Sequence, residues 1–188
     1  MRIHRLAMAL VRVTLCASCV RANTQESVVN QKRPLPSGAR GFDFYVGRWH
    51  IDNRRLRNRY VGSDEWDEFP AISTARPILG GLGNFDEIEF PTKGWSGVDV
   101  KVYDIEAQHW STRFIGSGDG KEQPALVGEF KNGVGELSGD DVDEGRPIRV
   151  RTRWTAITPK SFRWEQAFST DGGKTWETNW IMAARRID

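Results

Sequence analysis

The chain has 188 residues, a length that suits one domain with a sizeable core. Its net charge is +2, but residues 1–34 carry six lysines and arginines against one acid, so the remainder is mildly acidic. A mildly acidic body lacks the basic surface of a nucleic-acid-binding domain, and we expect no nucleic-acid partner.

Residues 1–40 are predicted to be a disordered leader and linker. A basic start, an apolar middle and small residues near the end are typical of a signal peptide, and we favour export to the periplasm or the outside. Arginines along one helical side with no acid before Glu26 also fit a mitochondrial transit peptide. A wrongly chosen start codon is the third reading of this stretch, and a cytoplasmic location stays open.

The leader suggests neither a membrane span nor a metal site. Its apolar run is too short and too charged for a transmembrane helix. The only two cysteines, Cys16 and Cys19, form a C-x-x-C pair. A metal or redox role would need a second ligand pair or an alternating strand–helix–strand pattern, and the sequence has neither.

Residues 41–188 are predicted to be one all-β domain. Short strands alternate with turn signals rich in Gly, Pro, Asn and Asp, and Asn132-Gly133 is a strong hairpin signal. Each strand has one apolar face, and a closed barrel leaves no strand edge unpaired. The sequence therefore predicts a single up-and-down antiparallel barrel of about ten strands. The predicted strands are residues 47–58, 62–69, 71–78, 84–90, 96–104, 108–116, 124–131, 133–140, 146–157, 161–169 and 174–185.

Alternation along the first strand predicts a charged residue inside the barrel. Counting by twos from Trp49 places Asn53 and Arg55 on the inner face. A guanidinium there costs free energy unless it is paired or meets an anion. We therefore expect an interior carboxylate or an acidic ligand group near Arg55, unless a β-bulge shifts the register.

The strand at residues 96–104 also divides into two faces. Its valines alternate with charged or polar side chains, so the valines are predicted to face the core. The predicted inner face is Val98, Val100 and Val102, and the predicted outer face is Asp99, Lys101 and Tyr103.

The first strand opens with Gly47-Arg48-Trp49, which resembles the G-x-W of lipocalins and other calycins. In that superfamily the tryptophan plugs the closed end of the barrel, and a basic residue at the end of the last strand packs over it. The resemblance implies that Gly47 and Trp49 are structural, and that Arg185 or Arg186 supplies the cation.

Longer stretches narrow the resemblance. The segments FDFYVGRW, RPILGGLGNFDE, GRPIRVRTRW and RWEQAFSTDGGKTWETNW resemble a family of bacterial lipocalin-like proteins of unassigned function, over about residues 41–186. That resemblance implies the fold but no reaction. The opening strand is also similar to that of bilin lyases, which makes chromophore handling a third hypothesis, although the only cysteines lie in the leader.

The segment STDGGKTW, from Ser169 to Trp176, resembles the Asp-box of sialidase propeller blades. One copy cannot build a propeller, which needs repeated blades. We therefore predict that it is a braced hairpin turn, and we do not favour a glycosidase.

Catalytic groups are sparse. Alternation places His50 and His109 outside, and beyond the leader no His or Cys pair has metal-ligand spacing, so we expect no metal and no cofactor. Carboxylates are plentiful, and Glu65 and Glu87 are the two candidates for a cavity acid or base.

The predicted cavity has an aromatic wall with a few polar groups, a composition typical of small-molecule sites. Its predicted lining is Asn53, Arg55, Trp66, Trp110, Thr112, Trp154, Trp164, Gln166, Thr178 and Trp180.

We favour lipocalin-like binding of a small, largely apolar molecule over catalysis. The alternative is a metal-free small barrel enzyme, an isomerase, cyclase or dehydratase acting on a hydrophobic substrate. An interior carboxylate beside open cavity space would favour the enzyme, whereas a cavity with only Asn, Gln, Thr and one Arg would favour the binder. The sequence leaves the oligomeric state open.

Overall fold

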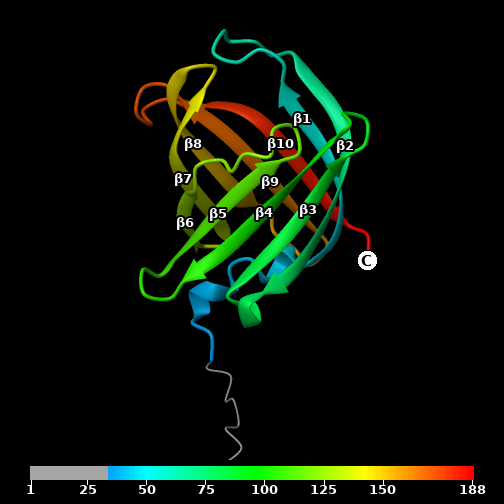
Figure 1. Ribbon diagram of the computed structural model, residues 1–188, viewed down its shortest axis with the longest axis vertical. Coiled ribbons are helices and arrows are strands. Elements are labelled where there is room, and N and C mark those ends of the chain that lie inside the picture. The colour runs from blue at the N-terminus through cyan, green and yellow to red at the C-terminus, as the bar shows by residue number, and fades with distance from the viewer. Residues whose placement is uncertain (1–33) are drawn as a thin grey trace, which may run out of the picture. The chain divides into compact units, whose positions relative to one another are not determined.

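Ten antiparallel strands close into a barrel in the computed structural model, which describes residues 34–188 (Figure 1). Each strand pairs with the next, and β1 pairs with β10 to complete the circle. This confirms the predicted all-β, single up-and-down barrel. The strands are β1 (Gly47–Leu56), β2 (Trp66–Ile78), β3 (Gly83–Phe90), β4 (Trp95–Asp104), β5 (His109–Gly116), β6 (Leu126–Lys131), β7 (Val134–Asp143), β8 (Arg146–Thr155), β9 (Ser161–Ser169) and β10 (Glu177–Arg186).

The predicted strands at 62–69 and 71–78 are one long strand, β2. Pro70 suggested a break, because proline cannot donate a ladder hydrogen bond. In the structure Pro70 is exposed and pairs with Asp52 in the middle of β2, and the strand continues through it.

The chain that precedes β1 closes one end of the barrel. Two short 3-10 helices, η1 (Ser37–Arg40) and η2 (Asp43–Tyr45), lie at the end where β1 begins (Figure 1). Ala39, Phe42 and Tyr45 are buried there. The folded unit therefore includes η1, four residues ahead of the predicted boundary at residue 41. The predicted leader, residues 1–33, lies outside the described residues, and within residues 34–188 no helix is long and apolar enough to cross a membrane.

Trp49 sits fully buried at this closed end, where its indole Nε1 donates to the carbonyl oxygen of Tyr45 at 2.8 Å. The cation over its ring is Arg186, whose Cζ lies 4.2 Å from the ring centroid. The other candidate, Arg185, points outward and donates to Asp52. Gly47 has a φ of +132°, and a Cβ at this position would collide with the guanidinium of Arg186, so only glycine fits.

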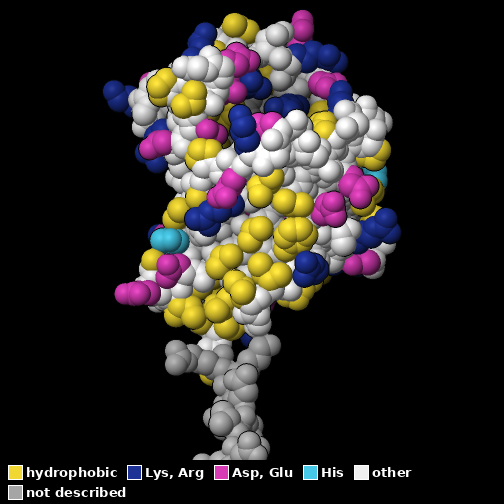
Figure 2. All heavy atoms as spheres, in the orientation of Figure 1, with side chains coloured by type: hydrophobic (Ala, Val, Ile, Leu, Met, Phe, Trp, Pro, Cys, Tyr) yellow, Lys and Arg dark blue, Asp and Glu magenta, His cyan; other side chains and the backbone are white. Residues whose placement is uncertain are grey.

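The faces of β4 are opposite to the predicted ones. Lys101 and Tyr103 are buried inside the barrel, and Asp99 faces the interior cavity. The valines of β4 lie half-buried on the outer face, together with Phe85 and Ile115 on the flanking strands. Figure 2 shows hydrophobic side chains gathered on the face where β3, β4 and β5 lie. Alternation gave the two faces of β4 correctly, but hydrophobicity assigned them to the wrong sides.

Candidate ligand cavity

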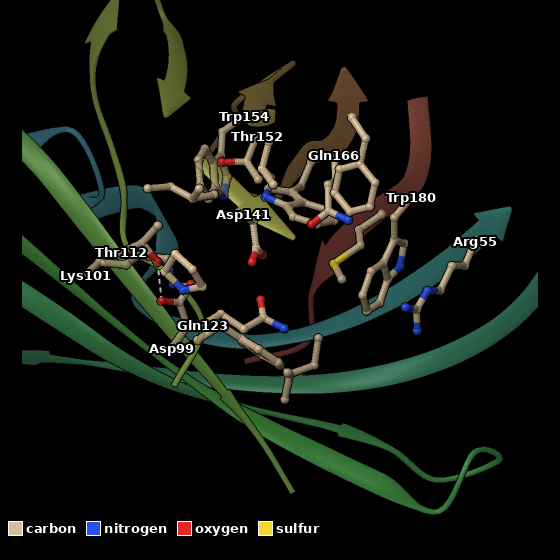
Figure 3. A pocket seen from close by; sticks show the side chains of 18 of the residues that line it. Arg55, Asp99, Lys101, Thr112, Gln123, Asp141, Thr152, Trp154, Gln166 and Trp180 are labelled. Carbon is tan, nitrogen blue, oxygen red and sulfur yellow. Dashed lines mark hydrogen bonds and ion pairs between the residues drawn. The ribbon is translucent and has the colours of Figure 1, made fainter. Parts of the chain in front are cut away.

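A cavity of about 260 Å³ lies inside the barrel (Figure 3). Its wall is mainly aromatic, and most of these rings come from β8, β9 and β10. The aromatic lining residues are Phe90, Phe114, Trp154, Phe162, Trp164, Phe168 and Trp180, with Tyr45 from the closed end.

The tryptophans of the wall are held in fixed orientations. Trp164 meets Trp180 edge to face, with ring centroids 5.8 Å apart at 84°, and it meets Trp154 at 6.5 Å and 65°. The indole Nε1 of Trp180 donates to Oδ1 of the buried Asn53 at 3.0 Å. A wall of packed and hydrogen-bonded rings needs little reorganisation when an apolar molecule enters.

A buried ionic cluster lies at the cavity wall formed by β3 and β4. Nζ of Lys101 binds Oδ1 of Asp86, and it lies 3.0 Å from Oδ2 of Asp99. Oδ2 of Asp86 accepts from the hydroxyls of Tyr45 at 3.3 Å and Ser73 at 3.4 Å. Thr112 on β5 donates its hydroxyl proton to Asp99, as the dashed line in Figure 3 marks. One ammonium group therefore meets two carboxyl groups in a site shielded from bulk water.

The environment of this cluster shifts the protonation of its members. Burial raises the pKa of Asp86, and Asp99 adds to this increase by repulsion. Burial works against the charge of Lys101, but attraction from Asp86 and Asp99 outweighs it and raises the pKa of Lys101. Burial, followed by repulsion from Asp86, raises the pKa of Tyr45, so that its phenol stays protonated. The cluster thus has a firmly held ammonium group and a carboxyl group, Asp86, that binds a proton more readily than usual.

Access to the cavity lies toward the other end of the barrel, where β1 ends. Arg55 lies with its Cζ 4.6 Å above the ring of Trp180, and burial, with repulsion from Arg59, lowers its pKa below the usual value for arginine. Arg59 is paired with Asp143 at 2.9 Å and with Glu144 at 3.1 Å. This end therefore has one paired and one stacked guanidinium.

The segment 117–125 forms another part of the rim. It turns back after β5, where Glu122 makes a bridge with Ile115, and the backbone N–H of Gln123 donates to the carbonyl oxygen of Phe114 at 2.8 Å. In Figure 3 the side chains of Gln123 and Asp141 point toward one another across the cavity.

Six of the ten residues predicted to line the cavity do so: Arg55, Thr112, Trp154, Trp164, Gln166 and Trp180. Two others are buried behind the lining. Asn53 holds the indole of Trp180, and Trp110 packs against Phe42 at the closed end and donates to the carbonyl oxygen of Gly38.

The remaining two predicted lining residues, Trp66 and Thr178, do not reach the cavity. Trp66 occupies a position of β2 whose side chain faces outward. It is half-buried there, near the guanidinium of Arg54. A register shift between Thr178 and Trp180 interrupts the alternation of β10. As a result Trp180 lines the cavity and Thr178 does not.

The two candidate acid/base residues, Glu65 and Glu87, are exposed on the outside of the barrel. Glu65 precedes β2, and Glu87 lies on the outward face of β3, one residue after the buried Asp86. The acids that line the cavity are Asp86, Asp99, Asp141 and Asp143, and the prediction missed Asp99 because the valines of β4 were assigned to the interior. The alternation of Asp99 and Lys101 was the available signal, since opposite charges two residues apart share one face of a strand.

Arg55 is the one cation in the predicted lining, but the cavity has two more. Arg59 and Lys101 also line it, and both are paired with acids. Within the described part of the chain, no group of His, Cys, Asp and Glu side chains could hold a metal ion.

No family model matches this chain, and no curated protein matches it in sequence. Eleven chains of solved structures match it. One of them is the S-type phycobiliprotein lyase CPES from Guillardia theta, with 13% sequence identity and a TM-score of 0.48, over 78% of this chain and 90% of that chain. A likeness at this level says nothing about what the present chain binds, and the resemblance to the bacterial lipocalin-like family stays a prediction.

Proposed function

We propose that the barrel binds a small, largely apolar molecule in its interior. The observation that carries this proposal is the cavity of about 260 Å³ with its wall of interlocked tryptophans and phenylalanines. An apolar wall with a few convergent polar groups is the usual composition of a ligand site. The volume lies just below the range of about 300–1,000 Å³ for such sites, which favours a compact molecule over a long lipid.

Binding can be tested with phenylnaphthylamine, a compact probe that is uncharged near neutral pH and fluoresces in apolar surroundings. The probe should bind to the wild-type protein and be displaced by the natural ligand. Trp164→Ala should weaken its binding by about tenfold or more, the effect of removing one large buried contact residue. Trp66→Ala is the matched control, because Trp66 lies outside the cavity and should leave the affinity unchanged. Equal affinity in all three proteins would contradict the proposal, and native mass spectrometry of the purified protein would identify a co-purified ligand.

Catalysis is the second candidate function, and one observation favours it. Asp99 lines the cavity and its carboxylate is held by Lys101 and Thr112. A positioned carboxylate inside an apolar cavity can take a proton from a substrate and return it elsewhere, as an isomerase, a cyclase or a dehydratase requires. In this scheme Asp99 replaces Glu65 and Glu87 as the acid/base, with Lys101 and Asp86 as positioning residues.

A measurement of turnover distinguishes catalysis from binding. A small amount of the protein is incubated with a metabolite extract whose compounds are in excess, and the compounds are compared before and after by chromatography and mass spectrometry. An enzyme converts many equivalents of one compound to an isomer, or to a product that lacks one water, and Asp99→Asn should abolish the conversion. A binder depletes one compound by at most one equivalent and converts none.

Export to the periplasm or the outside is our proposed location. It rests on the character of the leader alone, and the folded unit places one constraint on processing, because cleavage must leave η1 and η2 attached to the barrel.

A further inference from the structure

The hydrogen-bond donors of the inner cavity are largely committed to protein partners. Lys101 binds both Asp86 and Asp99, and its Nζ lies 4.4 Å from the ring centroid of Tyr45. Thr112 donates to Asp99, and Thr152 donates to the carbonyl oxygen of Leu137 at 3.4 Å. Apart from Arg55 at the open end, the donors that remain free for a ligand are neutral ones, the amide of Gln123 and the indole N–H groups of Trp154 and Trp164.

The hydrogen-bond acceptors of the cavity, in contrast, can accept further bonds from a ligand. A carboxylate offers about four lone-pair sites, and Asp99 uses one for Thr112 and one for Lys101. Asp141 accepts only from the backbone N–H of Val142, at 2.7 Å, among the described residues. Gln166 donates its amide N–H to Asn179 at 3.0 Å, so its carbonyl oxygen is the group left for a ligand.

The charges of the residues that line the cavity agree with this excess of hydrogen-bond acceptors. The ionisable residues that line the cavity are Arg55, Arg59 and Lys101, and Asp86, Asp99, Asp141 and Asp143. Arg59 and Asp143 pair at the open end, and Lys101 balances one of its two carboxylates. Away from Arg55, the cavity therefore has more negative than positive charge, and Asp141 has no ion-pair partner among residues 34–188.

We propose that the cavity is selective for a cationic amine, with its ammonium group directed to Asp99 and Asp141 and its apolar body against the tryptophan wall. The proposal deepens the proposed function and rests on it. The faces of tryptophan rings attract cations as well as apolar groups, so the wall suits both parts of such a molecule. An acidic ligand would instead have to turn its carboxylate outward, to Arg55.

Three probes with one apolar body and different ends test this: phenylbutylamine, phenylbutanol and phenylbutyrate, each measured by calorimetry near neutral pH. The amine should bind about 10- to 100-fold more tightly than the other two, the equivalent of one hydrogen bond between charged groups. Equal binding of all three, or tighter binding of phenylbutyrate, would overturn the proposal.

Two neighbouring residues of β7 provide a matched pair of variants. Asp141→Asn removes the unpaired charge in the cavity. It should lower the affinity for phenylbutylamine by about tenfold and leave the affinity for phenylbutanol unchanged. Asp140→Asn removes a charge that points outward to Arg149, and it should change neither affinity. Both variants leave the ionic cluster of Lys101 intact, so a failure to fold is not expected. If Asp141→Asn lowered the affinity for phenylbutylamine and for phenylbutanol by the same factor, the proposed contact between Asp141 and the ammonium group would be contradicted.

The outcomes also separate this inference from the proposed function. If all three probes bind without preference and Trp164→Ala weakens them, the cavity is a ligand site without amine selectivity. If none of the three binds but phenylnaphthylamine does, the amine proposal is wrong and the binding function stands. If phenylnaphthylamine does not bind either, both are wrong.

Discussion

Nζ of Lys101 lies 3.0 Å from Oδ2 of Asp99 while it also binds Asp86, and the side chain of Lys101 is 1% exposed. This pairing places three ionisable groups inside a barrel whose wall is otherwise aromatic. Each of these groups contacts a group of opposite charge, which lowers the cost of keeping it away from water.

Lys101→Met should therefore destabilise the protein strongly, because it leaves two buried carboxyl groups without a cation. We expect a loss of about 3–5 kcal/mol in the free energy of unfolding, measured by urea denaturation. Lys131→Met is the control, since Lys131 is exposed and its loss should cost less than about 1 kcal/mol. Similar losses in both variants would contradict the importance of the buried cluster.

Tyr45 should make the protein less stable at alkaline pH. Burial raises the pKa of Tyr45 above its ordinary value of 10.0, so above pH 10 the unfolded chain loses a proton that the folded protein keeps. Stability then falls as the pH rises, by up to about 1.4 kcal/mol per pH unit for this group. Lys101, whose pKa is also raised, adds a loss of the same sign above pH 10.5. Tyr45→Phe should flatten the decline measured by denaturation at several pH values, and an unchanged slope would disprove the assignment.

The two arginines at the end of β10 should behave differently. Arg186 donates to the carbonyl oxygens of Phe44, Val46 and Pro159, each at 2.8 Å, and covers Trp49. We expect Arg186→Ala to cost about 2–4 kcal/mol of unfolding free energy, because it removes several charge-assisted hydrogen bonds and a cation–π contact. Arg185→Ala removes only exposed contacts, with Asp52 and His50, and should cost less than about 1 kcal/mol. Thermal denaturation of the two variants side by side checks the ranking.

The hairpin between β9 and β10 should depend on Asp171. Its carboxylate accepts from Ser169 at 2.7 Å and from the backbone and hydroxyl of Thr175, and these bonds lower the pKa of Asp171. The braced turn predicted from the Asp-box resemblance is thus confirmed. Because this pKa is lowered, the stabilisation is present above pH 3.8 and is lost as the pH falls toward the folded value. Asp171→Ala should open residues 170–175 to limited proteolysis, and equal cleavage of variant and wild type would contradict this role.

The N-terminus of the mature protein offers a further test. Ala39 is buried, and the indole of Trp110 donates to the carbonyl oxygen of Gly38 at 2.9 Å. If the leader is removed on export, mass spectrometry of the secreted or periplasmic protein should find an N-terminus ahead of Ser37. A stable mature chain that begins after Tyr45 would show that the barrel closes without η1 and η2.

The sequence predicted the barrel well because strand alternation and turn residues repeat over the whole domain. It predicted the interior less well on β4, where hydrophobicity is a poor guide. Asp99 and Lys101 neutralise each other inside the barrel, and Val98, Val100 and Val102 are left outside, so each face has the composition expected of the other. The pair of Lys101 with Asp86 joins β4 to β3, and β4 considered alone does not reveal it.

The site was predicted in part for a related reason. The aromatic wall follows from the alternation of β8 and β9, which placed Trp154, Trp164 and Gln166 in the lining. On β10 the register shift moved Thr178 out of the lining, and a bulge depends on the neighbouring strand as well as on its own residues. Asp141 lies close to the end of β7, where the prediction considered no interior side chain.

The pairing of β1 with β10 has a consequence for how the chain is made in the cell. Residues Trp49 to Arg55 find their partners in Trp180 to Arg186, at the far end of the domain. A ribosome synthesises the chain from its N-terminus at about 5–20 residues per second, so β1 emerges long before the strand that covers its free edge. Until β10 has been made, any sheet that the growing chain forms leaves one edge of β1 unpaired. Any chaperone or export factor that meets it during synthesis therefore meets a surface that the finished barrel no longer has.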